Sequence, residues 1–383
     1  MGLEYILQVK DLSPNANLCV SLRTPLNIQE NIALAPFTTF RVGGPARYLV
    51  EACSESDIKE ALTFAAEKHL PLFVLGGGSN LVVADEGWPG LVLKIALKGI
   101  EFEFAGKFVV FHVRAGENWD DFVASTVERN CAGVECLSGI PGTVGATPVQ
   151  NVGAYGQEVS QTISAVRVLE IDDGKVSQFS NDQCSFSYRS SIFNQHAAGK
   201  YIVLEVTYRL KQDGEPTLAY ADLQRLFAAD QRKPSLRNVR DAVRQIRQSK
   251  AMLLVRGDED CRSAGSFFKN PIVSADEALR IDELAQKRTP SQVMPRFPMV
   301  DGRVKLAAAW LVEQSGFHKG YSNGPVAISR KHSLAIVNRG GATAQDIMAL
   351  KNEIEQKVLD VWGVRLQPEP VFVGFRAAEK EGR

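Results

Sequence analysis

Two glycine-rich segments carry the backbone chemistry that a phosphorylated cofactor needs. In the first, three consecutive glycines lack every Cβ, so backbone N–H groups can approach a phosphate closely. This segment consists of Gly76, Gly77, Gly78, Ser79 and Asn80. It is not a P-loop, because no Gly-Lys-Ser/Thr follows, and it lacks the third glycine and the following helix of the dinucleotide fingerprint. Taken alone, it fits a tight glycine turn at least as well.

The second segment, residues 137–156, reads Leu-Ser-Gly-Ile-Pro-Gly-Thr-Val-Gly-Ala-Thr-Pro-Val-Gln-Asn-Val-Gly-Ala-Tyr-Gly. Its glycines and prolines exclude an ordinary helix or strand. It is also too long and too apolar for a solvated linker. A diphosphate or an isoalloxazine edge needs such a backbone, held in fixed turns with its amides turned inward. A buried loop of unusual composition is the alternative, but the two segments together favour a nucleotide cofactor.

Composition excludes several classes of function. The chain of 383 residues has 44 basic and 44 acidic residues, which argues against a nucleic-acid partner. No apolar run reaches the length of a membrane span, and the N-terminus lacks the features of a secretory signal. The six cysteines show no zinc-ligand spacing, so we expect reduced thiols, no metal site and a cytoplasmic location.

The pattern of elements predicts an α+β protein with breaks near residues 95 and 250. Helices are predicted over 56–68 with Ser56 as the N-cap, around 119–127, after Ser235, over 306–312, and from Thr343 with a capping box to Asp346. Strands are predicted over 71–75, 81–83, 108–113, 165–171, 201–208, 333–337 and 370–374. The arginines at 237, 240, 244 and 247 are interpreted as a solvated helix face.

Five motifs in order resemble one enzyme family. Gly76–Asn80 looks like the pyrophosphate loop of the vanillyl-alcohol-oxidase-type FAD-binding fold, and residues 137–156 look like the second cofactor segment of the UDP-N-acetylenolpyruvoylglucosamine reductase family. Phe-Arg-Val-Gly-Gly-Pro at 40–45, Ser-Tyr-Arg-Ser-Ser-Ile-Phe at 187–193 and Ser-Ala-Gly-Ser-Phe-Phe-Lys-Asn-Pro at 263–271 resemble further motifs of that family. The class I form is indicated by Pro148-Val-Gln-Asn151 and by Tyr220, in the position of a tyrosine-bearing loop that folds over the substrate.

The resemblance implies a three-domain α+β architecture. A vanillyl-alcohol-oxidase/PCMH-type FAD-binding fold would comprise subdomains 1–95 and 96–250, and residues 251–363 would form a C-terminal substrate-binding domain. Residues 364–383 would return to the first subdomain as a strand.

The implied activity is the NADPH-dependent reduction of UDP-N-acetylglucosamine enolpyruvate to UDP-N-acetylmuramate through FAD, in peptidoglycan precursor synthesis. The FAD is expected to be non-covalent, because residues 76–80 contain no His or Cys that could tether it. No obligate protein partner is predicted. A flavin oxidase of the same superfamily and a non-catalytic cofactor-binding scaffold are the rival interpretations.

The resemblance also assigns residues to roles. Arg189 would pair with the substrate carboxylate, Ser266 would donate a proton to the carbanion, and Glu369 would help to polarise the enolate, which requires a protonated carboxyl or a donor. Cofactor contacts in the second segment are expected at Ser138, Gly139, Pro141, Gly142, Gly145, Gln150, Asn151, Gly153, Ala154 and Tyr155. Substrate contacts are expected at Tyr220, Lys250, Asn270 and His332. After Lys250, the stretch 251–262 looks longer than in many family members and lacks the Leu-Pro that often follows the lysine.

Overall fold

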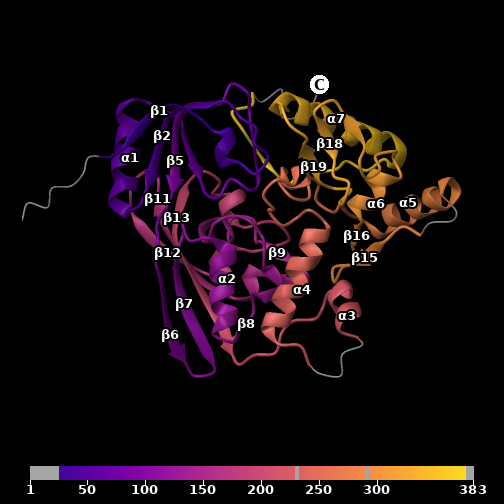
Figure 1. Cartoon of the computed structure of the whole chain (residues 1–383), viewed down its shortest axis with the longest axis horizontal. Helices are drawn as coiled ribbons and strands as arrows, with labels where there is room; N and C mark the ends of the chain where they lie inside the picture. Colours follow the sequence, from indigo (N-terminus) through magenta and orange to yellow (C-terminus); the bar gives the residue numbers. More distant parts are fainter. Residues whose placement is uncertain (1–25, 229–232, 290–292, 377–383) are drawn as a thin grey trace, which may run out of the picture.

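The computed structural model describes residues 26–228, 233–289 and 293–376, and its sheets follow one another along the chain (Figure 1). The first sheet has the strand order β1-β2-β5-β3. Its strands are β1 (Ile28–Ala33), β2 (Pro45–Ala52), β3 (Leu72–Leu75) and β5 (Trp88–Ile95). β5 is parallel to both β2 and β3, whereas β1 is antiparallel to β2. β3 ends at Leu75, so the glycine segment 76–80 begins at the carboxyl end of this strand.

Helix α1 (Glu55–Glu67) connects β2 to β3, and its N-cap lies two residues before the predicted cap. Its N-cap is Ser54, because Ser54 forms a reciprocal capping box with Asp57. Ser56, the predicted cap, lies inside the first turn. A capping box requires an acidic or amide residue three positions after the cap, and only Ser54 has Asp57 there.

The second sheet is antiparallel, with the order β12-β11-β13-β7-β6. Its strands are β6 (Ile100–Ala105), β7 (Phe108–Arg114), β11 (Ile163–Glu170), β12 (Val176–Ser180) and β13 (Tyr201–Gln212), and β8 (Cys131–Ala132) pairs with β13. Helix α2 (Trp119–Glu128) packs on this sheet through Phe122, whose ring lies 5.7 Å from Phe111 and 5.0 Å from Tyr208. The alternation of buried and partly buried residues along β7 places one face of the strand in this core.

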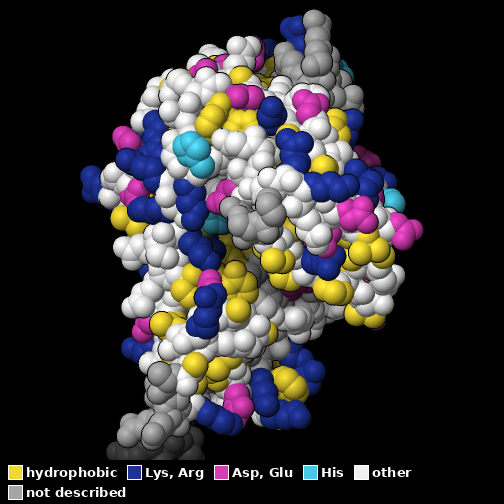
Figure 2. Space-filling model, turned by 90° about the vertical axis from the view of Figure 1, so that its right-hand side faces the viewer, with side chains coloured by type: hydrophobic (Ala, Val, Ile, Leu, Met, Phe, Trp, Pro, Cys, Tyr) yellow, Lys and Arg dark blue, Asp and Glu magenta, His cyan; other side chains and the backbone are white. Residues whose placement is uncertain are grey.

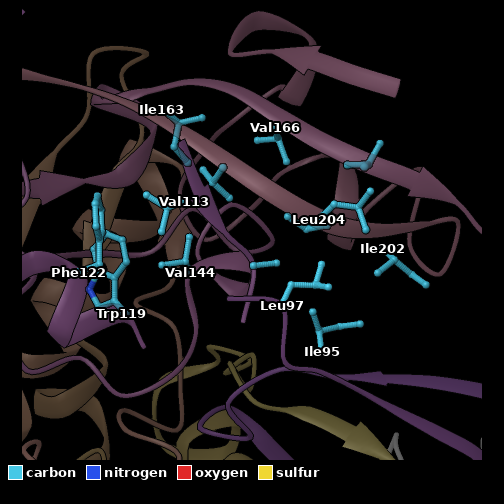
Figure 3. Packing of buried hydrophobic residues seen from close by; sticks show 14 of the residues in the cluster. Ile95, Leu97, Val113, Trp119, Phe122, Val144, Ile163, Val166, Ile202 and Leu204 are labelled. Carbon is cyan, nitrogen blue, oxygen red and sulfur yellow. The ribbon is translucent and has the colours of Figure 1, made fainter. Parts of the chain in front are cut away.

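The first two sheets share one hydrophobic core, which crosses the break predicted near residue 95. Ile95 and Leu97 pack with Val113, Val166 and Leu204 from the second sheet (Figure 3). The two halves of the cofactor-binding region therefore hold a fixed relation to one another.

The described C-terminal part contains two three-stranded sheets and three helices around a second core, to which Phe40, Val42 and Val82 of the first part also contribute. These elements are β14 (Ile272–Val273), α5 (Ala275–Arg288), β15 (Arg296–Pro298), β16 (Val304–Leu306), α6 (Ala308–Glu313), β17 (Ser322–Asn323), β18 (Val326–Ile328), β19 (Ile336–Asn338) and α7 (Ala344–Trp362). The helix predicted from Leu306 is wrong at its start, because Leu306 pairs with Arg296 in a strand ladder. α7 has the predicted capping box between Thr343 and Asp346.

The chain then returns to the first part of the molecule. β20 (Val371–Val373) pairs in parallel with β4 (Leu81–Val83), which directly follows the glycine segment. Between the second and third parts lie α3 (Ala221–Phe227) and α4 (Leu236–Ser249), the latter capped by Ser235 as predicted. Two short strands, β9 (Gly153–Ala154) and β10 (Gln157–Glu158), form a hairpin next to the second glycine segment.

The surface is mixed in character. Figure 2 shows basic, acidic and hydrophobic side chains interspersed on the side of the molecule that bears α5. Within the described ranges, no helix has the length and apolarity of a membrane span.

Candidate active site

A cavity of about 920 Å³ lies where the three parts of the chain meet. Both glycine segments line it, as do the three predicted catalytic residues. The predicted site residues on its wall are Gly76, Gly77, Gly78, Ser79, Asn80, Pro141, Gly142, Gly145, Gln150, Gly153, Ala154, Tyr155, Arg189, Tyr220, Lys250, Ser266, His332 and Glu369. Residues nearly 300 positions apart are thus brought to one surface.

The two glycine segments pack against each other with no room for side chains. A Cβ on Gly77 would stand 2.5 Å from the Cα of Gly142, and one on Gly78, whose φ is +65°, would stand 1.8 Å from the carbonyl oxygen of Phe37. The Ser79 hydroxyl donates to the Pro141 carbonyl at 2.9 Å and joins the segments. In the described part of the chain, the backbone N–H groups of residues 76–80 have no protein acceptor, so they are available to an anion in the cavity.

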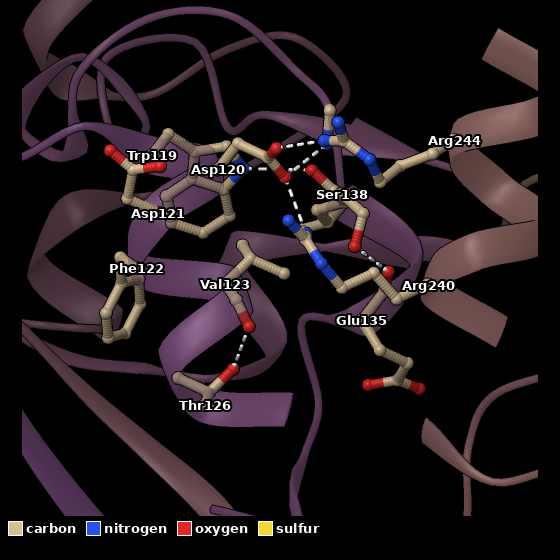
Figure 4. A network of polar contacts seen from close by, with 12 residues as sticks. Trp119, Asp120, Asp121, Phe122, Val123, Thr126, Glu135, Ser138, Arg240 and Arg244 are labelled. Atoms are coloured by element: carbon tan, nitrogen blue, oxygen red, sulfur yellow. Dashed lines mark hydrogen bonds and ion pairs between the residues drawn. The ribbon is translucent and has the colours of Figure 1, made fainter. Parts of the chain in front are cut away.

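Ser138 and Gly139 do not line the cavity but anchor the start of the second segment. The Gly139 N–H donates to Asp120 on α2 at 2.6 Å, and Arg240 and Arg244 from α4 converge on the same carboxylate (Figure 4). Burial would raise the pKa of Asp120, but the Arg240 and Gly139 hydrogen bonds hold it below its ordinary value. These two arginines are therefore partners in a partly buried network rather than the solvated face that was predicted.

Asn80 joins three segments that are distant in sequence. Its side-chain amide donates to the Gln150 side chain at 2.7 Å and to the Glu369 carbonyl at 3.2 Å. Its carbonyl accepts from the Val371 N–H at 2.9 Å. Asn80 therefore fixes the first glycine segment to the second and to the segment that carries Glu369 and leads into β20.

Arg189 projects from a tight turn and is held from two sides. Its φ is +54°, a strained value for a residue with a side chain, in a turn closed by paired hydrogen bonds between Ser187 and Ser190. Nη2 donates to the Gly153 carbonyl at 2.8 Å, and Nε forms an ion pair with the Glu369 carboxylate at 3.0 Å. The guanidinium thus has a fixed orientation at the cavity wall.

Asn151 lies just behind that turn. It is 1% exposed and donates to the Ser187 carbonyl at 3.0 Å and to the Glu158 carboxylate at 2.9 Å. Asn151 therefore supports the Arg189 turn from outside the cavity. Asn270 is likewise outside the wall, where its side-chain oxygen accepts from the Ala308 N–H at the start of α6.

Ser266 and Glu369 are neighbours through a short antiparallel pairing. Phe268 pairs with Pro368, and the Glu369 N–H donates to the Phe267 carbonyl at 2.8 Å. Burial raises the pKa of the Glu369 carboxyl, although the charges of Arg189 and Lys269 oppose that shift. Ser266 and Glu369 thus lie on adjacent backbone segments and line one cavity, where a largely buried carboxyl can take part in proton transfer.

Two residues that the sequence did not single out also shape the site. The Thr39 hydroxyl donates to the Ser263 carbonyl at 2.6 Å, and its N–H donates to the Gly78 carbonyl at 3.2 Å, which joins the first glycine segment to the serine motif. Arg247 is 9% exposed and lines the cavity, so its assignment to a solvated face is wrong. The sequence of α4 does not distinguish Arg247 from the other polar residues of that helix. Thr39 directly precedes the Phe-Arg-Val-Gly-Gly-Pro motif, and this position could have identified it.

Tyr220 and Lys250 form the outer wall. The Tyr220 ring packs edge-on against Tyr155 with centroids 5.1 Å apart, and Lys250 lies over Tyr220 at 5.8 Å while it pairs with Asp222 at 2.9 Å. Cys136, which directly precedes the second segment, is fully buried, and its thiol donates to the Thr217 carbonyl. It does not line the cavity.

His332 lines the cavity and uses one ring nitrogen for the backbone. Nδ1 accepts from the Leu334 N–H at 3.0 Å, so in the neutral ring the proton lies on Nε2. Burial, followed by the charges of Lys250, Lys319 and Arg247, lowers the pKa of His332 to about 4. The ring is therefore a neutral hydrogen-bond donor near pH 7.

This lowered pKa predicts a pH-dependent stability. The unfolded chain binds a proton on His332 below its ordinary pKa of 6.5, but the folded chain does so only near 4. Stability linked to His332 is thus complete above pH 6.5 and is lost as the pH falls towards 4. Between pH 7 and pH 5, we expect wild type to lose about 2 kcal/mol more unfolding free energy than His332→Gln. Denaturant unfolding at both pH values measures this difference, and equal losses would contradict it.

Comparisons with known proteins agree with this geometry. Residues 46–180 match the family described as FAD binding domain, and residues 257–373 match the family described as UDP-N-acetylenolpyruvoylglucosamine reductase, C-terminal domain. The reductase of that name from Thermobifida fusca is 45% identical, over 90% of this chain and 97% of the relative. The one from Streptomyces coelicolor is 44% identical, over 95% of each chain.

The fold is shared with a solved structure. The crystal structure titled UDP-N-acetylenolpyruvylglucosamine reductase from Thermus caldophilus has a TM-score of 0.62 and 26% identity, and the match covers 91% of this chain and 99% of that one. The predicted α+β, vanillyl-alcohol-oxidase-type FAD-binding fold is confirmed. The chain belongs to the UDP-N-acetylenolpyruvoylglucosamine reductase family.

Proposed function

We propose that the cavity binds FAD together with UDP-N-acetylglucosamine enolpyruvate, and that Arg189, Ser266 and Glu369 act on the enolpyruvyl group. The chain is an NADPH-dependent flavin reductase that forms UDP-N-acetylmuramate for peptidoglycan synthesis. The observation that carries the proposed residue roles is the Arg189–Glu369 ion pair of 3.0 Å, next to Ser266 on a cavity lined by both glycine segments.

The residues present fit FAD. Residues 76–80 line the cavity, their N–H groups have no protein acceptor within the described chain, and the missing Cβ atoms of Gly77 and Gly78 allow close backbone packing. The pyrophosphate would lie against residues 76–80, and residues 141–155 would support the flavin edge. A volume of about 920 Å³ is at the upper end of ordinary ligand pockets, as two ligands in one site require.

When bound, the cofactor supplies hydride transfer from NADPH to the methylene carbon of the substrate. Charge then develops on the neighbouring carbon, which bears the ether oxygen and the carboxylate. Arg189 would hold that carboxylate, since its guanidinium is already oriented by Gly153 and Glu369. Ser266 would deliver the proton that completes the lactyl ether, and its hydroxyl must then be reprotonated from solvent or a neighbour.

The proposed role of Glu369 requires a protonated carboxyl or a hydrogen-bond donor, and the direction of its pKa shift supports that role. A carboxylate would repel the developing enolate, whereas a protonated carboxyl donates a hydrogen bond to it. Burial raises the pKa of Glu369 in the required direction. When the substrate carboxylate takes Arg189 as its partner, the ion pair that opposes this shift is weakened.

On the substrate side, Tyr220, Lys250 and His332 would contact the UDP-sugar, and Asn270 would act indirectly by holding the start of α6. We propose the domain boundaries 1–95, 96–250 and 251–363. Residues 1–25 and 377–383 lie outside the described part of the chain. The cytoplasmic location and the lack of an obligate protein partner likewise stay predictions.

The test is NADPH oxidation followed at the nicotinamide absorbance band, with and without UDP-N-acetylglucosamine enolpyruvate. Consumption that requires the UDP-sugar, with one UDP-N-acetylmuramate formed per NADPH, supports the proposal. Consumption with oxygen alone, unchanged by the UDP-sugar, would favour the flavin oxidase instead.

Gly77→Ala is expected to release FAD. The new methyl group would stand 2.5 Å from the Gly142 Cα, so the two glycine segments must separate. We expect the FAD dissociation constant to rise at least about tenfold, the equivalent of roughly 1.4 kcal/mol. Flavin fluorescence titration measures the change. Gly174→Ala is the control for local backbone strain alone, because its φ is +69° but nothing lies within 4 Å of its Cβ position, and FAD affinity equal to that control would refute the expectation.

A further inference from the structure

The stretch that follows Lys250 forms a strap along the cavity. The strap, residues 251–262, begins at Ala251 with φ +53° directly after the end of α4. The Met252 N–H donates to the Arg247 carbonyl, and Arg247 in turn donates to the Met252 carbonyl. Ala251, Met252, Leu254 and Cys261 line the cavity, so the strap contributes part of its wall.

A buried carboxylate fixes the far end of the strap. The Asp260 side chain is 2% exposed and pairs with Arg339 at 2.9 Å and with Arg330 at 3.3 Å. The Arg330 N–H also approaches Asp260 at 3.4 Å. Arg330 belongs to the hairpin loop 329–335 between β18 and β19, so Asp260 ties the strap to that loop. A second, more exposed ion pair joins Asp258 and Lys331 at 2.6 Å.

The same hairpin loop carries His332. Ser329 donates its N–H to the Ala335 carbonyl, and the Leu334 N–H donates to Nδ1 of His332, so the loop is a closed turn with the imidazole fixed inside it. His332 lies two residues after Arg330. The position of Arg330 in the loop is set by its contact with Asp260. The orientation of the His332 ring, and with it of its Nε2–H, therefore depends on that contact.

We infer that Asp260 is a positioning residue for the UDP-sugar: it docks the strap onto the loop 329–335 and thereby aims the Nε2–H of His332 at an acceptor oxygen of the ligand. The inference rests on the proposed function. The strap contributes Met252 and Leu254 as the apolar part of the same wall, so one carboxylate sets both the polar and the apolar contacts on this side of the cavity. Removing it leaves two arginines without their buried partner, and the loop shifts.

The first experiment compares Asp260→Asn with Asp301→Asn in the holoenzyme. Asp301 also pairs with an arginine, Arg303 at 2.7 Å, but both side chains are about half exposed. For Asp260→Asn we expect the KM for the UDP-sugar to rise about tenfold, with the maximal rate of flavin reduction by NADPH unchanged. Asp301→Asn should match wild type in both. A thermal unfolding midpoint for each variant separates misfolding from mispositioning.

A double-mutant cycle tests whether Asp260 acts through His332. Asp260→Asn should raise the KM about tenfold in the wild-type background but less than about twofold in His332→Gln, because the aimed group is already gone. Asp260→Glu, which keeps the charge for both arginines but displaces the carboxylate by one methylene, provides a second route if the asparagine variant folds poorly. A KM unchanged by Asp260→Asn, or effects of the two substitutions that simply multiply, would overturn the inference. Wild-type enzyme that ignores the UDP-sugar would instead refute the proposed function.

Discussion

Ser266→Ala is expected to slow reoxidation of the reduced flavin by the UDP-sugar by roughly 10²–10⁴-fold, the range that a positioned general acid contributes. Ser266 lines the cavity next to Glu369, and the variant removes only a hydroxyl from a segment held by backbone pairing. The backbone at Phe267 and Phe268 should therefore stay in place. Reduction of the flavin by NADPH should keep its wild-type maximal rate, because no proton to substrate carbon is needed in that half-reaction.

Anaerobic rapid mixing separates the two halves, with flavin absorbance as the readout. Ser164→Ala, an exposed serine on β11 that lies outside the cavity, controls for the loss of a hydroxyl. If Ser266→Ala slows both half-reactions equally, the serine shapes the cofactor site and is not the proton donor. If it slows neither, another group supplies the proton.

Glu369→Ala is expected to lower the rate of flavin reoxidation by the UDP-sugar by roughly 10²–10³-fold, whereas the rate for Glu369→Gln should stay within about tenfold of wild type. Glutamine keeps the volume and a hydrogen-bond donor, as a protonated carboxyl does. Alanine also leaves Arg189 without its partner at 3.0 Å.

The pH profile gives an independent check on the role of Glu369. Its raised pKa means that the protonated form persists above the ordinary carboxylate range and is lost as the pH rises through that pKa. The wild-type rate should fall on that alkaline side, and Glu369→Gln should lack that fall. A glutamine variant as impaired as alanine would show that the ionised carboxylate is the active form.

The local features of the site were predictable because each is written in a short stretch of sequence. The glycines of residues 76–80 and the turn residues of 137–156 permit few backbone conformations, and the Thr343 and Ser235 caps follow from side chains three residues apart. The motifs around Arg189, Ser266 and Glu369 identified them as candidate catalytic residues. The fold places all three on the wall of one cavity.

What could not be predicted depends on contacts between distant segments. Arg247 resembles its neighbours on α4 until that helix packs on the cavity, and Thr39 gains its role only from the Ser263 carbonyl, 224 positions away. Asn270 and Asn151 have polar side chains in motif positions, yet their hydrogen-bond partners turn them away from the cavity. The direction of the Glu369 pKa likewise follows from burial, which a sequence does not specify.

The return of the last strand to the first glycine segment has a consequence for how the enzyme matures in the cell. Residues 76–80 leave the ribosome early, but Asn80 finds its partners, Glu369 and Val371, only when the end of the chain emerges. Domains that fold during translation do so from the N-terminus. The contacts that join the first glycine segment to Glu369 and Val371 can therefore form only after these late residues have been synthesised.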